Sequence, residues 1–233
     1  MTAAEWGAYL PDFLAGLGVS LRLTAAALGV GLPVGALLGL ATTARRAPLR
    51  WTCVAFVEIG RGAPGLIVLY LVYYGLPQLD LTWSSFASAT LALGLSTAAY
   101  SAEVFRAGIN AVPAGQREAS RALGLSRGAE LRFVVLPQAV RTIVPPLAGV
   151  AILLFQGTSL AFAIAVPELL SRAYNAATIT YQFTATLTVA GAMYAAVSLL
   201  AVALLRLPRP GRRIRRSFAA AGTAPHPTDG RSS

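Results

Sequence analysis

Long apolar stretches, separated by short segments rich in arginine, dominate the pattern of this chain. The hydrocarbon core of a bilayer is about 30 Å thick, so a crossing α-helix needs about 20 predominantly apolar residues. Five stretches meet this requirement and predict helices at about residues 14–44, 51–77, 84–106, 138–165 and 182–205. We therefore expect an all-α integral membrane protein with five transmembrane helices.

The arginines predict the orientation of these helices, because short loops rich in Lys or Arg stay on the cytoplasmic side. Arginines follow the first predicted helix, fill the segment between the third and the fourth, and follow the fifth. The connection 78–82 carries one charged residue, Asp80, and the connection between the fourth and fifth helices carries one arginine, Arg172. We therefore expect the N-terminal segment 1–12 outside, and a disordered basic tail at 207–233 in the cytoplasm.

Composition excludes several other classes. Charged residues make up 12% of the chain and its mean hydropathy is +0.64, whereas a soluble domain carries about a quarter charged residues, so a soluble bundle of buried helices is disfavoured. The net charge is +10, but the arginines cluster between apolar stretches rather than beside polar and aromatic patches, which argues against nucleic-acid binding. Cys53 and His226 are single residues of their kind, so no metal site is expected.

The segment 107–137, between the third and fourth predicted helices, has a pattern of its own. Pro113 suits a helix start, and the apolar residues up to Leu123 share one side of the next turns, which predicts a short amphipathic helix. Gly124 can take the left-handed conformation that ends a helix, and Ser126 can cap a second one. The sequence thus predicts two short helices that meet at a glycine.

Three groups of residues in this segment stand at fixed spacing: Glu118-Ala119-Ser120, then Gly124 after three residues, then Val134-Val135-Leu136-Pro137 after nine more. Together they resemble the EAA motif of ABC importer permeases, with Ser120 replacing the second Ala and Val134 replacing Ile. In that family the segment forms the coupling helix that docks on the cytoplasmic ATPase. The resemblance implies that role for five residues here: Glu118, Ala119, Ser120, Gly124 and Pro137.

Further runs narrow the family. They are Arg61-Gly62-Ala63-Pro64, residues 100–109, residues 112–116, Leu136-Pro137-Gln138-Ala139 and Val166-Pro167-Glu168-Leu169. These runs are similar to permeases of the polar amino-acid branch, which import histidine, glutamine, glutamate, arginine and opines. The resemblance covers about residues 13–205, and it implies a type I importer permease fold, of the MetI-like kind, over residues 13–206.

The resemblance also implies a location and partners. We expect a multi-pass protein of the bacterial cytoplasmic membrane that works with two ATP-binding subunits, a second permease and an extracytoplasmic solute-binding protein. The second permease is either a copy or a paralogue. The chain contains no Lys and hence no phosphate-binding G-x-x-x-x-G-K-[ST] loop, so we expect no catalytic site or cofactor of its own, with ATP and Mg²⁺ bound by the partner ATPase.

Two rival functions remain to be weighed. An ion-driven secondary transporter would usually show paired interrupted helices in repeated halves, and the sequence shows no such repeat. An integral membrane enzyme would gather several acids, histidines or cysteines at one depth, which this sequence does not indicate.

Four ionisable residues inside predicted helices are candidates for the translocation path or for local neutralisation. Glu58 and Arg61 stand three residues apart, as do Glu103 and Arg106, so each pair can meet on one helix face. Charges inside a membrane are costly and suggest a function. We take Glu58, Arg61 and Glu103 as candidates for the path.

The end of the fourth predicted helix bears on the solute. The amino-acid branch commonly reads Lys-Asp-Thr-Ser-Leu there, and this chain reads Gln156-Gly157-Thr158-Ser159-Leu160. The loss of both charges favours a zwitterionic or neutral solute, including a compatible solute such as ectoine, over a cationic one. Gln156, Thr158 and Ser159 are further candidates for the path, although hydroxyls in membrane helices also bond to backbone carbonyls.

Overall fold

The computed structural model describes residues 3–206, and the side chains of residues 6–205, as helices joined by short connections. Within that range no strand occurs, so the all-α class is confirmed. The elements are α1 (Ala3–Ala41), α2 (Ala47–Gly62), α3 (Gly65–Tyr70), a π-helical turn (Leu71–Gly75), a 3₁₀ turn (Leu76–Leu79), α4 (Ser85–Asn110), α5 (Ala114–Ala122), α6 (Arg127–Ala129), a π-helical turn (Glu130–Val135), α7 (Leu136–Gly157), a 3₁₀ turn (Thr158–Ile164), α8 (Leu169–Thr180) and α9 (Phe183–Arg206). The predicted tail, residues 207–233, lies outside the described residues.

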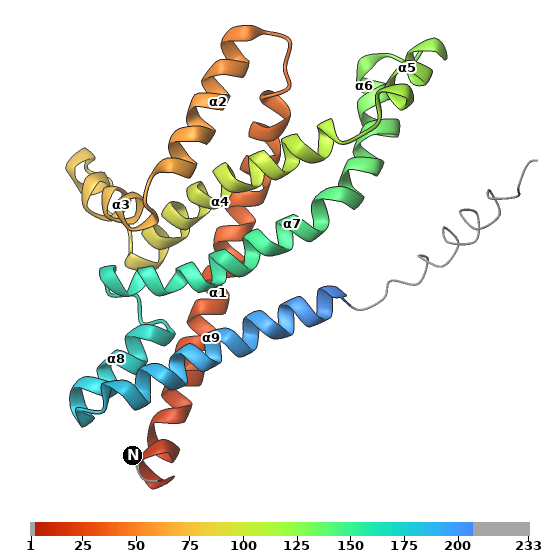
Figure 1. The fold of residues 1–233 in the computed structure, drawn as a ribbon. Coiled ribbons are helices and arrows are strands. Elements are labelled where there is room, and N and C mark those ends of the chain that lie inside the picture. The colour runs from red at the N-terminus through yellow and green to blue at the C-terminus, as the bar shows by residue number, and fades with distance from the viewer. Residues whose placement is uncertain (1–2, 207–233) are drawn as a thin grey trace, which may run out of the picture.

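Helix α1 runs along the molecule, and its most extensive contact is with α4 (Figure 1). Gly31, Gly35 and Gly39 recur every four residues on the side of α1 that faces α4. A Cβ atom on Gly35 would lie 2.0 Å from the hydroxyl oxygen of Ser101. Small residues at this spacing let two helix backbones approach closely, as is common between membrane helices. The α1–α4 contact forms the centre of the fold.

Helix α1 begins at Ala3, so the predicted helix start near residue 14 is wrong, while the location of residues 1–12 outside the cell stays a prediction. Trp6 packs edge-on against Phe13 with 6.5 Å between ring centroids, and both belong to a cluster with α8 and α9. Asp12 pairs with Arg172 of α8 at 2.9 Å. These tertiary contacts stabilise the first turns of α1, which a count of apolar residues does not predict to be helical.

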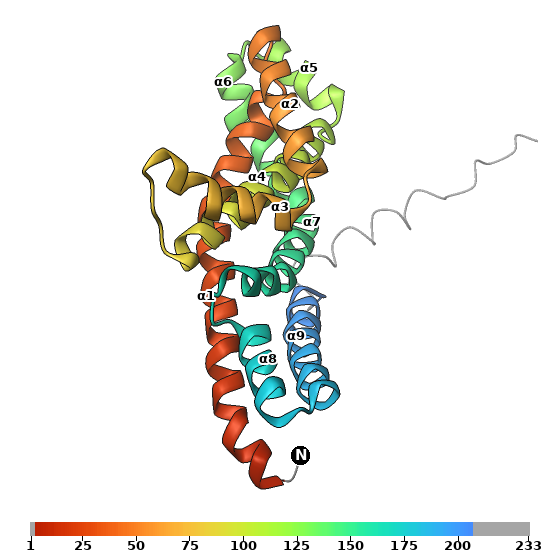
Figure 2. The same cartoon turned by 90° about the vertical axis from the view of Figure 1, so that its left-hand side faces the viewer.

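The second predicted span, 51–77, is broken rather than continuous. Helix α2 ends at Gly62, and the helical path resumes at Gly65 after a bend of 104° (Figure 2). Pro64 has no N–H to donate, and a residue before proline is driven out of the helical region; Ala63 accordingly has φ −73° and ψ 131°. An apolar count misses this break because both halves are apolar.

The connection between the fourth and fifth predicted helices is itself helical. Its helix, α8, has 12 residues, too few to cross a bilayer, so the search for long apolar stretches missed it. It packs on α1 and α9 at the end of the molecule away from α5 and α6 (Figure 1). The predicted helix at 138–165 is part of a longer path that starts at Arg127, and the helix predicted at 182–205 is α9.

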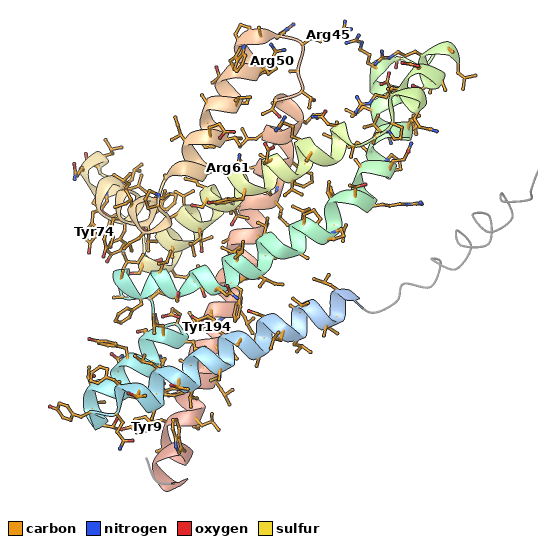
Figure 3. All side chains as sticks on the ribbon, viewed as in Figure 1. Tyr9, Arg45, Arg50, Arg61, Tyr74 and Tyr194 are labelled. Atoms are coloured by element: carbon orange, nitrogen blue, oxygen red, sulfur yellow. The ribbon has the colours of Figure 1, made fainter. Side chains whose placement is uncertain are left out.

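Three helical paths among the described residues are long and apolar enough to cross a membrane: Trp6–Ala41, Arg127–Ile164 and Phe183–Leu205. The bent pair of α2 and α3 adds a fourth if it counts as one span. Helix α4, predicted at 84–106, is not among them: it is long enough, but its serines, threonines and other polar residues make it less apolar than the three paths. The number of five spans and the orientation of the termini stay predictions. Arg45 and Arg50 lie at the same end of the molecule as α5 and α6 (Figure 3), as the arginine rule expects.

Candidate functional site

The segment between α4 and α7 folds into two short helices that meet at Gly124. Helix α5 ends in a pair of backbone bonds: the N–H of Leu125 donates to the carbonyl of Ser120 at 3.1 Å, and the N–H of Gly124 donates to that of Arg121 at 2.9 Å. This pairing needs a left-handed residue, and Gly124 has a φ of +76°. The predicted glycine turn is therefore confirmed. We call residues 114–129 the coupling hairpin, after the role that the resemblance to the EAA motif predicts for them.

Side chains tie the hairpin to the helical turn that follows. Arg121 Nε lies 3.0 Å from a carboxylate oxygen of Glu130, and this hydrogen bond lowers the pKa of Glu130. Ser126 accepts a hydrogen bond from the N–H of Ala129 at 3.3 Å and caps α6, as the sequence predicts. Together these contacts fix the direction in which α5 leaves the membrane helices.

The five residues predicted to couple to an ATPase do not share one face. Ser120 is buried, and its hydroxyl donates to the carbonyl of Arg117 at 2.8 Å, so it supports α5 from inside. The apolar side chain of Leu123, by contrast, is 81% exposed at the surface of the hairpin. The other four predicted residues are exposed: Glu118, Ala119, Gly124 and Pro137.

Pro137 lies in the first turn of α7, as predicted, but α7 continues the preceding π-helical turn Glu130–Val135 without a break. Proline cannot donate the backbone bond that a helix interior requires, and a local widening of the helix accommodates this loss. The coupling hairpin is thus joined to α7 through one helical path, which can carry motion from one to the other.

Two ion pairs occupy neighbouring positions on α2 and α4. Arg61 lies 3.3 Å from Glu58, and Arg106 Nε lies 2.9 Å from Glu103, so the predicted pairing within each helix is confirmed. The hydroxyl of Tyr100 also donates to the carbonyl of Arg61 at 3.2 Å. All four charged side chains are at least partly exposed at the surface of the molecule.

The polar residues at the end of α7 lie in different surroundings. Gln156 is exposed, and its amide nitrogen donates to the hydroxyl of Ser198 on α9 at 3.2 Å. Thr158 is fully buried, and its hydroxyl donates to the carbonyl of Phe155 at 2.7 Å. The hydroxyl of Ser159 donates to the carbonyl of Gln156 at 2.8 Å. Both hydroxyls are thus bonded to their own helix, while Gln156 is the open member of the group.

A cavity of about 410 Å³ lies between α1, α7 and α9. Its lining is apolar at the surface and includes Leu21, Ile152, Phe155 and Leu205. Thr24 and Ser198 also line it, but the surface that it exposes is apolar, so a polar solute that entered would replace few of its hydrogen bonds to water. The cavity is therefore unsuited to a polar solute.

Glu168 is a buried carboxylate that the sequence reasoning did not place among the site residues. Its side chain is fully buried at the start of α8 and accepts the N–H of Leu170 at 2.8 Å and that of Ser171 at 2.7 Å. The hydroxyl of Tyr194 on α9 donates to the same carboxylate at 2.6 Å. The hydroxyl of Ser20 on α1 approaches it at 3.5 Å. We call this set the Glu168 network.

The Glu168 network joins three helices that are far apart in the sequence. Ser20 also accepts the N–H of Leu169 at 3.3 Å, so the first three N–H groups of α8 are all satisfied. The positive end of the α8 dipole favours the carboxylate there. The signal available in the sequence was an acid between a proline and an apolar run, which is typical of a helix cap. Among the described residues, no group of three His, Cys, Asp or Glu side chains could hold a metal ion.

Comparison with known proteins gives a consistent set of relatives. Residues 31–214 match the family described as "Binding-protein-dependent transport system inner membrane component". The probable amino-acid ABC transporter permease protein YckA of Bacillus subtilis (strain 168) is 37% identical over 163 residues, which are 70% of this chain and 72% of YckA. The arginine transport system permease protein ArtQ of the same organism is 35% identical over 186 residues, 79% of this chain and 85% of ArtQ. A crystal structure of an amino acid ABC transporter with histidines superposes with a TM-score of 0.83 and 31% identity, covering 89% of this chain and 97% of that one.

Proposed function

Because the chain belongs to the family of binding-protein-dependent transport system inner membrane components, we propose that it is the permease subunit of an ATP-driven importer for a polar amino acid or a related solute. Members of this family are inner membrane components of transport systems, and membership in it implies that the chain works with an ATPase and a binding protein. The polar amino-acid class is supported by the relatives YckA and ArtQ and by the amino acid transporter of similar structure.

The coupling hairpin is the observation that carries this proposal. Leu123 is held outward on a short helix that backbone bonds and an ion pair fix in place. A large apolar side chain presented in this way suits the groove of a partner protein better than it suits water. Glu118 stands open on the same helix and can contact a basic group at the rim of that groove. The resemblance to the EAA motif supports the ATPase as the partner that provides this groove.

The assembly that we propose has two permease subunits, two ATP-binding subunits and one extracytoplasmic binding protein. The hairpin and the C-terminus lie in the cytoplasm, and the N-terminus lies outside. ATP and Mg²⁺ bind to the ATPases, and this chain has no catalytic site or cofactor of its own. Closure of the ATPases moves the coupling hairpins, and the helical path Arg127–Ile164 carries this motion into the membrane as a rigid body.

For the translocation path we propose the predicted residues that are at least partly open and whose side chains are not bonded to their own helix backbone: Glu58, Arg61, Glu103 and Gln156. Thr158 and Ser159 support the end of α7 through their bonds to the helix backbone. The absence of charge at Gln156 and Gly157 favours a zwitterionic or neutral solute. A compatible solute such as ectoine is therefore an alternative to a polar amino acid.

Co-purification and reconstitution test the proposed function. When the chain is affinity-purified from native membranes, an ATPase should co-purify with it. Proteoliposomes that contain this complex and the binding protein should take up solute only when ATP is present. Glu118→Lys should weaken the association with the ATPase and reduce uptake, because it reverses a charge at the contact. Glu118→Gln is the matched control and should retain more of the association with the ATPase and more of the solute uptake than Glu118→Lys does. Purification of the wild-type chain without any ATPase would contradict the proposal.

Competition for uptake tests the solute class. Zwitterionic and neutral amino acids, and ectoine, should compete with the transported solute better than arginine does, when all are supplied with the native binding protein. Arginine as the preferred solute would reject the argument from Gln156 and Gly157 while leaving the permease function intact.

A further inference from the structure

Helix α9 contacts the rest of the molecule along one narrow side. Over its apolar stretch, only 11% of the helix is buried. Within the described part of α9, the buried residues are Thr186, Ala190 and Ser198, and the half-buried Tyr194 completes a spacing of four residues. Residues four apart lie on the same side of a helix, so we call these four the α9 stripe. Because so little of α9 is buried, the contacts of this stripe determine how the helix sits against its neighbours.

Tyr194 anchors the α9 stripe to two other helices. Its hydroxyl donates to the carboxylate of Glu168 at 2.6 Å, and the hydroxyl of Ser20 lies 3.4 Å from it. The carboxylate is itself held by the N–H groups of Leu170 and Ser171 on α8. A polar group in an apolar setting must keep its partner, so such bonds between helices fix orientation as well as contact. Tyr194 therefore sets the position of α9 against α1 and α8.

The same stripe also meets the end of α7 that carries Gln156, a residue of the proposed path. The ring of Tyr194 lies 5.2 Å from that of Phe155, measured between centroids. One helical turn further along α9, the hydroxyl of Ser198 accepts a hydrogen bond from the amide nitrogen of Gln156 at 3.2 Å. Two successive residues of α7 thus contact two successive positions of the α9 stripe, and the placement of α9 determines where Ser198 meets the amide.

The bond to Ser198 gives the amide of Gln156 a definite direction. A glutamine side chain has several rotatable bonds, and an exposed one without a partner samples many rotamers. Ser198 is 7% exposed, so its hydroxyl is a fixed partner for a side chain that is itself exposed. A group whose direction is set beforehand loses less rotamer freedom when it binds a solute. Because side-chain hydrogen bonds are lost beyond about 3.5 Å, a small shift of α9 would release the amide.

We propose that Ser198 and Tyr194 are positioning residues for Gln156. Ser198 holds the amide in the direction in which it meets the solute, and Tyr194, anchored on Glu168, holds Ser198 in place. The proposal rests on the proposed function, because that function puts Gln156 on the translocation path. It gives the Glu168 network a role in transport besides its role as the cap of α8.

The ratio of two rates in the assembled transporter tests the proposal. Proteoliposomes contain the chain, its ATPase and saturating native binding protein, and a radiolabelled mixture of zwitterionic amino acids and ectoine is supplied. The amount of solute taken up per ATP hydrolysed should fall roughly 2- to 10-fold in Ser198→Ala, the effect of losing one neutral hydrogen bond. In Tyr194→Phe, which keeps the ring, it should fall less. A variant that only weakens the fold lowers uptake and hydrolysis together and leaves their ratio unchanged.

Two controls show whether the effect passes through Gln156. Thr186→Val removes a buried hydroxyl of the same stripe that bonds to carbonyls of its own helix, at 3.0 and 3.3 Å, so its ratio should equal that of the wild type. Gln156→Ala should lower the ratio by itself. Added to Gln156→Ala, the substitutions Ser198→Ala and Tyr194→Phe should have no further effect, because residues that act through Gln156 cannot act in its absence.

The outcomes distinguish this proposal from the proposed function. An unchanged ratio in Ser198→Ala or in Gln156→Ala overturns the proposal, as does an equal fall in Thr186→Val. Effects of Ser198→Ala and Tyr194→Phe that persist in the Gln156→Ala background also overturn it. In each of these cases, ATP-dependent uptake by the wild-type chain leaves the proposed function intact. An absence of such uptake rejects the proposed function, and the positioning role is rejected with it.

Discussion

The Glu168 network and the coupling hairpin each contain a carboxylate, and the two carboxylates lie in opposite environments. Glu168 is buried, and its oxygens accept two backbone N–H groups of α8 and the hydroxyl of Tyr194. Glu118 is exposed on α5, and the apolar side chain of Leu123, at the end of that helix, is directed away from the chain's own core. The carboxylate of Glu168 is satisfied within the fold, whereas that of Glu118 is presented at the surface.

This contrast separates two kinds of role. A buried and fully bonded carboxylate holds helices together, since any change leaves its partners unsatisfied in an apolar setting. An exposed carboxylate contributes little to folding, so its effect must come through a partner. Variants at the Glu168 network should therefore change stability, and variants at the coupling hairpin should change turnover.

The largest effect on stability is expected from Glu168→Ala. The substitution removes the acceptor of the Tyr194 hydroxyl and of the N–H groups of Leu170 and Ser171. The loss should be on the order of 3 kcal/mol, because several buried groups become unsatisfied at once. Thermal unfolding of the purified chain in detergent measures it. Glu58→Ala, which removes an exposed carboxylate, is the control, and an equal fall in melting temperature for both would break the contrast.

Gly124→Val should act on turnover instead. A β-branched residue at φ +76° should strain the hairpin by on the order of 1 to 2 kcal/mol and misdirect α5. ATP hydrolysis stimulated by the binding protein, and solute uptake, should both fall in proteoliposomes after insertion has been checked. Gly128→Val is the matched control, since Gly128 lies in the same hairpin and does not have a positive φ. Wild-type transport by Gly124→Val would show that the hairpin has no coupling role.

Tyr194→Phe should have a smaller effect on stability than loss of the carboxylate. It removes the hydroxyl that lies 2.6 Å from Glu168 but keeps the ring, which packs on Phe155 with 5.2 Å between centroids. The cost should be on the order of 1 kcal/mol, because Glu168 retains its backbone donors. Melting temperature again measures the change. Tyr181→Phe, at a residue that is 86% exposed, should leave the melting temperature unchanged, and a similar fall in both would count against the network.

The parts that the sequence predicted correctly depend on local signals. The glycine turn at Gly124 and the cap at Ser126 are set by residues within a few positions, as are the i, i+3 ion pairs of α2 and α4. Long apolar stretches likewise predicted most of the helices, because lipid imposes a minimum length on them.

The parts that were missed depend on contacts between distant residues or on a single backbone constraint. Ser20 and Glu168 are 148 positions apart, so the sequence around either residue does not predict that they come into contact. The early start of α1 depends on aromatic packing against α8 and α9. The bend at Ala63 and Pro64 was present in the sequence, but the surrounding apolar residues concealed it.

The smallest effect concerns the ion pair that stiffens the coupling hairpin. The hydrogen bond from Arg121 lowers the pKa of Glu130, so the folded hairpin binds a proton less readily than an unfolded chain, in which a Glu titrates near about 4.3. The pair therefore stabilises the hairpin above about pH 4.3, and this contribution is lost as pH falls through the lower pKa of the folded state. Hydrogen exchange of the amides of residues 125–130, corrected for intrinsic rates, should show protection near neutral pH that declines in acid.

Arg121→Gln should remove both the protection near neutral pH and its dependence on pH. The control is Arg132→Gln in the following turn, which leaves the contact between Arg121 and Glu130 intact. Ion pairs with an exposed partner contribute little, so uptake should change less than in Gly124→Val. An unaltered pH profile of exchange in Arg121→Gln would mean that the backbone bonds at Gly124 alone hold the hairpin, and that its stiffness comes from the turn rather than from charge.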